Sequence, residues 1–157
     1  MATRPITPEG HARLTARLEQ LKKVEEPRII QEVATAREHG DLRENAEYHA
    51  AREKHGMIRA EMAMLEGALS DCEIIDPTKL AGDKVAFGAT VKLSNLDTSE
   101  EVTWRIVGPI EADSDRGTIS YESPLARQLI GREIGDEVKV TTPGGKRTYE
   151  VLDISFE

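Results

Sequence analysis

Hydrophobic side chains recur at helical spacing through most of the first half of the chain. The clearest series follows position 45 in alternating steps of three and four: Tyr48, Ala51, His55, Ile58, Met62, Leu65, Leu69 and Cys72. This spacing is typical of a helix that packs along one side against another helix. It predicts a helix of about 32 residues, which at about 1.5 Å per residue extends about 50 Å.

A second helical series precedes this one in the chain. Thr7 fits the N-cap position of a helix and Pro8 fits its first turn. The packing side then carries Leu14, Leu18 and Leu21, and after an interruption Ile30, Val33 and Arg37. Pro27 lies in the interruption, and because it lacks an amide hydrogen it predicts a kink in one continuous rod.

The two helical series are joined by a short polar stretch that predicts a tight turn. Gly40 can adopt the left-handed conformation that ends a helix, and Asp41 can accept hydrogen bonds from the amides that open the next helix. We therefore predict an antiparallel helical hairpin whose tip carries the carboxyls of Asp41 and Glu44. Arg37 and Arg52 flank this tip, where they either face solvent beside carboxylates or meet phosphates.

The spacing of Asp41 and Glu44 has two explanations. Asp-x-x-Glu is the pattern of a capping box, in which both side chains bind backbone amides. Alternatively the two carboxyls are ligands for Mg²⁺, which prefers oxygen and octahedral coordination. Two carboxylates cannot complete such a site, so the second explanation requires another molecule to supply the remaining ligands.

Beyond Lys84 the pattern changes from helical to alternating, which predicts strands. The candidate strands are residues 85–87, 89–96, 102–107, 118–121, 137–141 and 147–156. Ser123 and Pro124 fit the start of a short helix that Gly131 ends. The fold class is therefore α+β, with an antiparallel coiled-coil hairpin over residues 1–76 and an antiparallel sheet with one short helix over residues 77–157.

Charge and composition restrict the possible partners. The 157 residues carry a net charge of −8, and each half carries about −4, so neither half is a broad basic surface for nucleic acid. Cys72 is the only cysteine, which excludes an internal disulfide and fits a reducing cytoplasm. No apolar segment is long enough to cross a bilayer, so we expect a cytoplasmic protein with no membrane partner.

Several segments together resemble the bacterial Gre transcript cleavage factors of the GreA type. The longest is AREHGDLRENAEYHAARE at residues 36–53. The others are FGATV at 87–91, RIVG at 105–108, SPLAR at 123–127, LIG at 129–131 and TPGG at 142–145. The resemblance covers nearly the whole chain and occurs in the same order along it.

The resemblance implies an FKBP-like C-terminal domain that docks on RNA polymerase, and a coiled coil that enters the secondary channel of the polymerase. Asp41 and Glu44 match the acidic tip, which helps to hold Mg²⁺ jointly with the polymerase, so that a backtracked complex hydrolyses its own transcript. Arg37 and Arg52 match positions that meet the 3′ segment of the nascent RNA. Ser123 and Pro124 match the segment that contacts polymerase. We accordingly expect a monomeric accessory factor, not an enzyme in itself, with no metal bound by the free protein.

Two other functions fit parts of the sequence. An inhibitory Gre homologue would enter the channel without promoting cleavage, although the intact Asp41 and Glu44 pair argues against it. A prolyl isomerase would fit an FKBP-like fold, but fold alone does not determine function. That activity also requires an aromatic pocket, whereas the aromatics here fall where core residues are expected, as for Trp104 on a strand face.

Overall fold

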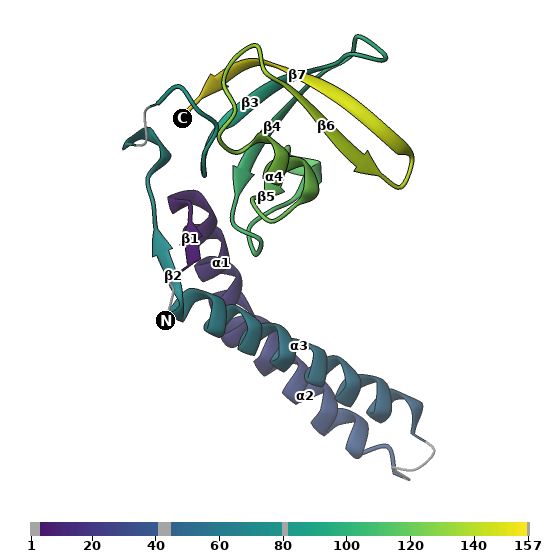
Figure 1. The fold of residues 1–157 in the computed structure, drawn as a ribbon. Coiled ribbons are helices and arrows are strands. Elements are labelled where there is room, and N and C mark those ends of the chain that lie inside the picture. Colours follow the sequence, from purple (N-terminus) through teal and green to yellow (C-terminus); the bar gives the residue numbers. More distant parts are fainter. Residues whose placement is uncertain (1–3, 41–44, 80–81, 157) are drawn as a thin grey trace. The chain divides into compact units, whose positions relative to one another are not determined.

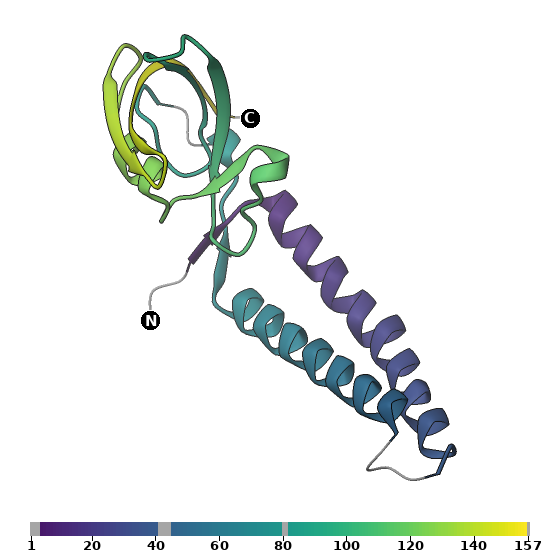
Figure 2. The same ribbon diagram turned by 90° about the vertical axis from the view of Figure 1, so that its right-hand side faces the viewer.

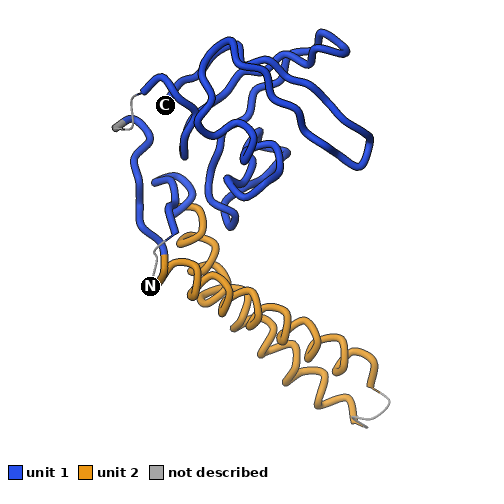
Figure 3. The backbone as a smooth tube through the Cα atoms, viewed as in Figure 1, with its two compact units in different colours: residues 1–11, 72–157 blue, residues 12–71 orange. Residues whose placement is uncertain are grey.

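The computed structural model describes residues 4–40, 45–79 and 82–156 and divides the chain into two compact units. One unit comprises residues 12–71 and the other comprises residues 1–11 together with 72–157 (Figure 3). The domain division predicted from the sequence, after residue 76, differs in where it assigns residues 1–11 and 72–76. In the part of the chain that the structure describes, no helix has the length and apolar character needed to span a bilayer.

The helical unit is an antiparallel hairpin. One helical rod consists of α1 (Pro8–Gln20), a π-helical turn η1 (Leu21–Glu25) and α2 (Glu26–Arg37), and the return helix is α3 (Ala46–Ser70). α2 and α3 lie side by side in both views (Figures 1 and 2). The predicted seam of α3 is confirmed, because Tyr48, Ala51, Ile58 and Leu65 are buried. Its predicted end was wrong, since Cys72 already belongs to a strand.

The π-helical turn corrects the predicted phase of the first rod. Its buried residues are Leu14, Leu21, Ile29 and Ala36, so the usual step of seven becomes eight between Leu21 and Ile29. Ile30, which the sequence pattern placed in the seam, is 51% exposed, and Arg37 is also exposed. The amide of Glu26 donates to the carbonyl of Leu21, five residues earlier, and this wider turn takes up the extra residue just before Pro27.

The other unit is built on a curled five-stranded sheet (Figure 1). Its strands are β3 (Thr90–Asn95), β4 (Glu101–Val107), β5 (Thr118–Ser120), β6 (Glu137–Thr142) and β7 (Gly145–Ser155), in the order β5-β4-β3-β7-β6. All neighbouring pairs are antiparallel except β4 and β5, which are parallel. The predicted α+β fold is confirmed.

One short helix, α4 (Pro124–Leu129), completes the core of this unit. Ala126 and Leu129 of α4 are fully buried against the sheet residues Val91, Leu93, Ile106, Val138 and Val151. Trp104 is half-buried against the same cluster. Val85 belongs to the core, but residues 85–87 do not form the predicted strand. Instead the Val85 amide and carbonyl bond to Arg132 and Gly131, in the loop after α4.

Two short strands that the sequence pattern did not reveal join the ends of the helical region. β1 (Arg4–Ile6) pairs in parallel with β2 (Cys72–Ile74), with Arg4 opposite Cys72. Thr7 then caps α1 as predicted, because its hydroxyl accepts from the Gly10 amide at 3.0 Å. Short 3-10 turns lie at η2 (Pro77–Lys79) and η3 (Ser114–Arg116).

The start of α1 is held by a buried carboxylate. Glu111 is 3% exposed and accepts from the amides of Thr7 and Gly108, each at 3.0 Å, and also from the Thr7 hydroxyl. Gly10 permits this close approach, since a Cβ at that position would lie 2.1 Å from a Glu111 carboxylate oxygen. The first turn of α1 therefore depends on a residue 104 positions away in the sequence.

Candidate functional site

Asn45 fixes both helix ends at the tip of the hairpin. Its Oδ1 accepts from the Tyr48 amide at 3.0 Å, which makes Asn45 the N-cap of α3. Its Nδ2 donates to the carbonyl of Ala36, in the last turn of α2, at 2.6 Å. One side chain thus satisfies a free amide of α3 and adds a second donor to the Ala36 carbonyl of α2, which also accepts from the His39 amide at 3.1 Å.

The end of α2 follows the prediction made for Gly40. α2 ends at Arg37, and Gly40 has a φ of 107°, a conformation that glycine adopts without steric cost. Asp41 and Glu44 lie outside the described residues. α3 begins at Ala46 with Asn45 as its N-cap, the role that the sequence pattern had offered to Asp41.

Tyr48 contacts both arginines that were predicted to bind nucleic acid. The guanidinium carbons of Arg37 and Arg52 each lie 5.7 Å from the centre of the Tyr48 ring, within the range of a cation–π contact. Hydrogen bonding with Arg37 lowers the pKa of the Tyr48 phenol, burial opposes this shift, and the charge of Arg52 adds to it. Tyr48 is 5% exposed, whereas both arginines are exposed.

Two histidines lie at this end of the hairpin. His39 lies 3.1 Å from the carboxylate of Glu47, which links the residues after α2 to the first turn of α3. The His49 ring lies 5.6 Å from that of Tyr48 at a tilt of 60°. The side chains of Arg37, His49 and Arg52 therefore lie around the Tyr48 ring.

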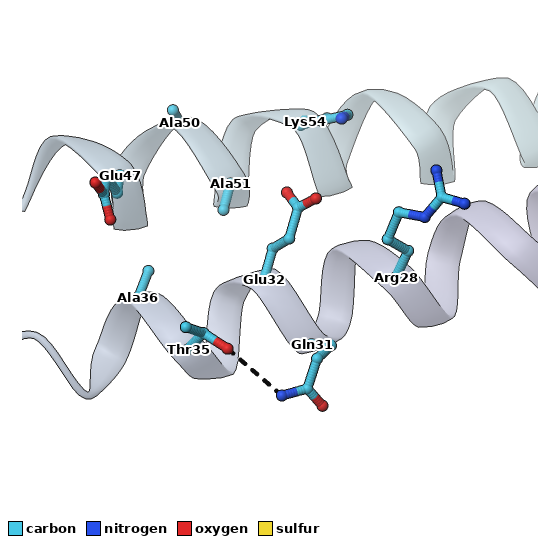
Figure 4. Close-up of a pocket in the computed structure, with 9 residues that line it drawn as sticks. All are labelled: Arg28, Gln31, Glu32, Thr35, Ala36, Glu47, Ala50, Ala51 and Lys54. Carbon is cyan, nitrogen blue, oxygen red and sulfur yellow. Dashed lines mark hydrogen bonds between the residues drawn. The ribbon is translucent and has the colours of Figure 1, made fainter.

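A groove of about 640 Å³ lies between α2 and α3 below the tip (Figure 4). Its lining combines small side chains with charges of both signs: Arg28, Gln31, Glu32, Thr35, Ala36, Glu47, Ala50, Ala51 and Lys54. Arg37, Tyr48 and Arg52 are not part of this lining. The groove and the arginine cluster are thus separate features of the hairpin.

Ser123 and Pro124 begin α4 as predicted. The Ser123 hydroxyl accepts from the Ala126 amide at 3.2 Å, so Ser123 is the N-cap. Pro124 occupies the first turn and is exposed, whereas Ser123 is half-buried. Of the two predicted polymerase-binding residues, Pro124 offers the exposed surface and Ser123 already has a structural role.

Sequence reasoning did not single out Asn45 or assign Tyr48 a function. Asn45 stands immediately before the long α3 seam, which is where an N-cap is expected, but Asp41 was a competing candidate of the same kind. Tyr48 was correctly assigned to the seam. Its contact with Arg37 joins two helices, so no sequence pattern within one helix predicts it. Among the described residues, no group of three or more His, Cys, Asp or Glu side chains could hold a metal ion.

Two family models together match nearly the whole chain. Residues 4–74 match the family model described as transcription elongation factor, N-terminal, and residues 80–156 match transcription elongation factor, GreA/GreB, C-term. The chain is 55% identical over 152 residues to transcription elongation factor GreA of Ruegeria pomeroyi, covering 97% of each protein. It is 53% identical over 154 residues to GreA of Francisella philomiragia, covering 98% of this chain and 96% of that protein.

Among solved structures, the crystal structure of GreA factor homolog 1 from Thermus thermophilus matches with 27% identity. The match covers 98% of this chain and 99% of that chain, with a TM-score of 0.45.

Proposed function

Because this chain belongs to the GreA/GreB family of transcription elongation factors, we propose that it binds RNA polymerase and stimulates cleavage of the nascent transcript in backtracked complexes. The helical hairpin enters the secondary channel, and the tip reaches the active centre. The polymerase performs the hydrolysis, and this chain acts as an accessory factor in the cytoplasm.

The capping of α3 by Asn45 is the observation that carries the proposal. The competing explanation for Asp41 and Glu44 was a capping box at the start of this helix. Asn45 accepts from the Tyr48 amide instead, so α3 does not require Asp41 as its cap. A chemical role for the two carboxyls is then the better explanation for their place in the turn between α2 and α3.

The donor chemistry at the tip fits Mg²⁺. Asp41 and Glu44 offer the hard oxygen ligands that Mg²⁺ prefers, and this ion is commonly bound by one or two carboxylates together with phosphates and water. The polymerase and its RNA would supply the remaining ligands, because two carboxylates alone cannot complete the octahedral coordination of Mg²⁺. When bound, the ion supplies Lewis-acid activation for hydrolysis of the RNA backbone.

Two further surfaces support this function. Arg37 and Arg52 would meet the phosphates of the RNA 3′ segment, since both are exposed and lie beside the tip. Pro124 would contact polymerase, because it is exposed at the start of α4. We propose that the factor acts as a monomer.

The aromatic side chains of the sheet unit favour this function over a prolyl isomerase. The rings of Phe87 and Tyr121 pack edge to face with centres 6.3 Å apart. Trp104, Tyr149 and Phe156 pack against the hydrophobic core. These rings therefore contribute to the packing of the fold, as expected of a docking domain.

Asp41→Asn tests the proposal directly. Asparagine keeps the shape of the side chain but removes the charged oxygen, so we expect transcript cleavage in a stalled, backtracked complex to fall by about a hundredfold or more. The variant should retain its helicity and still compete with the parent for polymerase. Raised Mg²⁺ should restore part of the activity.

Asp97→Asn is the matched control, because Asp97 is an exposed aspartate in the β3–β4 connection. It should cleave as the parent does. Near-normal cleavage by Asp41→Asn at low Mg²⁺ would remove the catalytic assignment and leave a factor that docks without assisting hydrolysis.

A further inference from the structure

We infer that Tyr48 is a positioning residue that holds Arg37 and Arg52 together as one phosphate clamp. The inference rests on the proposed function, because the ligand of the clamp would be the phosphate backbone of the RNA 3′ segment. The two arginines come from different helices, Arg37 from the end of α2 and Arg52 from α3. Their common contact is the ring of Tyr48.

The guanidinium groups of Arg37 and Arg52 both lie beside the Tyr48 ring. Each guanidinium carbon lies 5.7 Å from the Tyr48 ring centre, so the two carbons are no farther apart than twice that distance. Arg52 follows Tyr48 by four residues, which puts both on the same side of α3. Tyr48 therefore joins a cation of its own helix to a cation of the neighbouring helix.

The ring itself is held in place. Tyr48 is 5% exposed in the seam of the hairpin, and its amide donates to Asn45 at the start of α3. A buried aromatic side chain has few accessible rotamers, whereas arginine is among the most flexible side chains. The immobile ring thus restricts two exposed cations that would otherwise move freely.

A guanidinium beside an aromatic ring keeps most of its hydrogen-bond donors available. Arginine has five donors in a planar fork that matches phosphate oxygens, and a hydrogen bond to the Tyr48 phenol engages only part of that fork. Among the described residues, neither Arg37 nor Arg52 forms an ion pair with a carboxylate. Prior restriction by Tyr48 lowers the entropic cost when RNA binds, which is the physical basis of the proposed role.

Substitutions at Tyr48 separate this role from simple packing. Tyr48→Leu keeps an apolar seam residue but removes the ring, and we expect RNA crosslinking and cleavage at limiting factor to fall about five- to tenfold. Cleavage at saturating factor should change little, since the reacting groups are untouched. Tyr48→Phe keeps the ring face and should stay within about threefold of the parent.

Ile58→Ala is the control for loss of packing. Ile58 is 8% exposed in the same α3 seam and follows Tyr48 by ten residues. Its variant should lower the melting temperature without a matching loss of RNA crosslinking at a temperature where it is folded. If Ile58→Ala and Tyr48→Leu lose crosslinking in proportion to their loss of stability, Tyr48 only packs and the inference is wrong.

A double-mutant cycle provides the decisive measurement. Arg37→Gln should cost several-fold in crosslinking in the parent but much less in Tyr48→Leu, because the ring no longer positions the arginine. Equal costs in both backgrounds would overturn the positioning role while leaving the RNA contact intact. If Arg37→Gln and Arg52→Gln change nothing in the parent, the RNA contact fails and the clamp fails with it.

Titration of Tyr48 reports the contact independently of activity. Arg37→Gln removes the group that most lowers the pKa of the phenol, so that pKa should rise toward its ordinary value of 10.0. Nuclear magnetic resonance of the labelled tyrosine ring would follow this titration in the free protein. An unchanged pKa would show that the two side chains do not meet in solution, which also overturns the inference.

Discussion

The two helices of the hairpin start in different ways. The start of α1 depends on Glu111, a carboxylate 3% exposed that accepts from two amides and a hydroxyl across 104 sequence positions. The start of α3 depends on Asn45, a half-buried amide whose partners lie within nine residues along the chain. The first device is buried, charged and distant in sequence, and the second is local and neutral.

The two helix starts should therefore respond differently to substitution. A buried carboxylate is tolerated only when its hydrogen bonds are satisfied, so the contacts of Glu111 are expected to be strongly interdependent. A neutral cap near the surface contributes about 1 kcal/mol and orders the backbone without burying charge. We therefore expect changes at Glu111 to destabilise the protein strongly and changes near the tip to affect activity with a smaller loss of stability.

The largest effect on stability is expected for Glu111→Ala. The change leaves the amides of Thr7 and Gly108 without their acceptor, and it should lower the free energy of unfolding by about 3 kcal/mol. Chemical denaturation of the full chain measures this directly. Glu122→Ala is the control, since Glu122 is an exposed glutamate of the same unit and its loss should change stability by less than about 0.5 kcal/mol. A similar loss in both variants would contradict the role assigned to Glu111.

The comparison also explains what could be predicted from the sequence. The α3 seam was predictable because its heptad spacing is local and uninterrupted, and Tyr48, Ala51, Ile58 and Leu65 are indeed buried. The helix starts at Thr7 and Ser123 were predictable because each cap precedes a proline in the first helical turn.

The errors arose where geometry depends on distant or irregular contacts. The π-helical turn shifts the seam from Ile30 to Ile29, and a regular period cannot anticipate one extra residue. The β1–β2 pair and the Glu111 contacts each join the N-terminal residues to segments far along the chain. At the tip, Asp41 and Asn45 were equally suitable caps by residue type, and only the observed hydrogen bonds distinguish them.

A third helix start, that of α4, can be compared with those of α1 and α3. Its N-cap is the neutral side chain of Ser123, and the next residue, Pro124, is exposed. Pro124→Glu places a charge on an exposed residue, so the free energy of unfolding should stay within about 0.5 kcal/mol of the parent. Its affinity for polymerase should fall about tenfold, which corresponds to about 1.4 kcal/mol. Competition with labelled parent protein measures the affinity. A folded variant that competes as well as the parent would exclude Pro124 from the docking surface.

At Asn45 two substitutions divide the functions of the side chain, and one of them should leave stability almost unchanged. Asn45→Ala removes the cap and the bond to the Ala36 carbonyl, and it should cost about 1 kcal/mol. Asn45→Asp keeps the cap and adds a favourable charge at the helix N-terminus, so unfolding should change by only a few tenths of a kcal/mol.

The aspartate variant nevertheless loses one of the links between the two helices. An ionised carboxylate cannot donate, so the Ala36 carbonyl at the end of α2 loses the bond that Asn45 Nδ2 makes at 2.6 Å. Amide hydrogen exchange should therefore accelerate in the last turn of α2 and stay unchanged in the first turn of α3. Cleavage at saturating factor should fall several-fold while polymerase competition is retained, because the helix ends on either side of Asp41 and Glu44 are less firmly fixed to each other. If amide exchange in the last turn of α2 is as slow in Asn45→Asp as in the parent, the bond from Asn45 Nδ2 does not hold that turn. Asn45 would then serve only as the N-cap of α3.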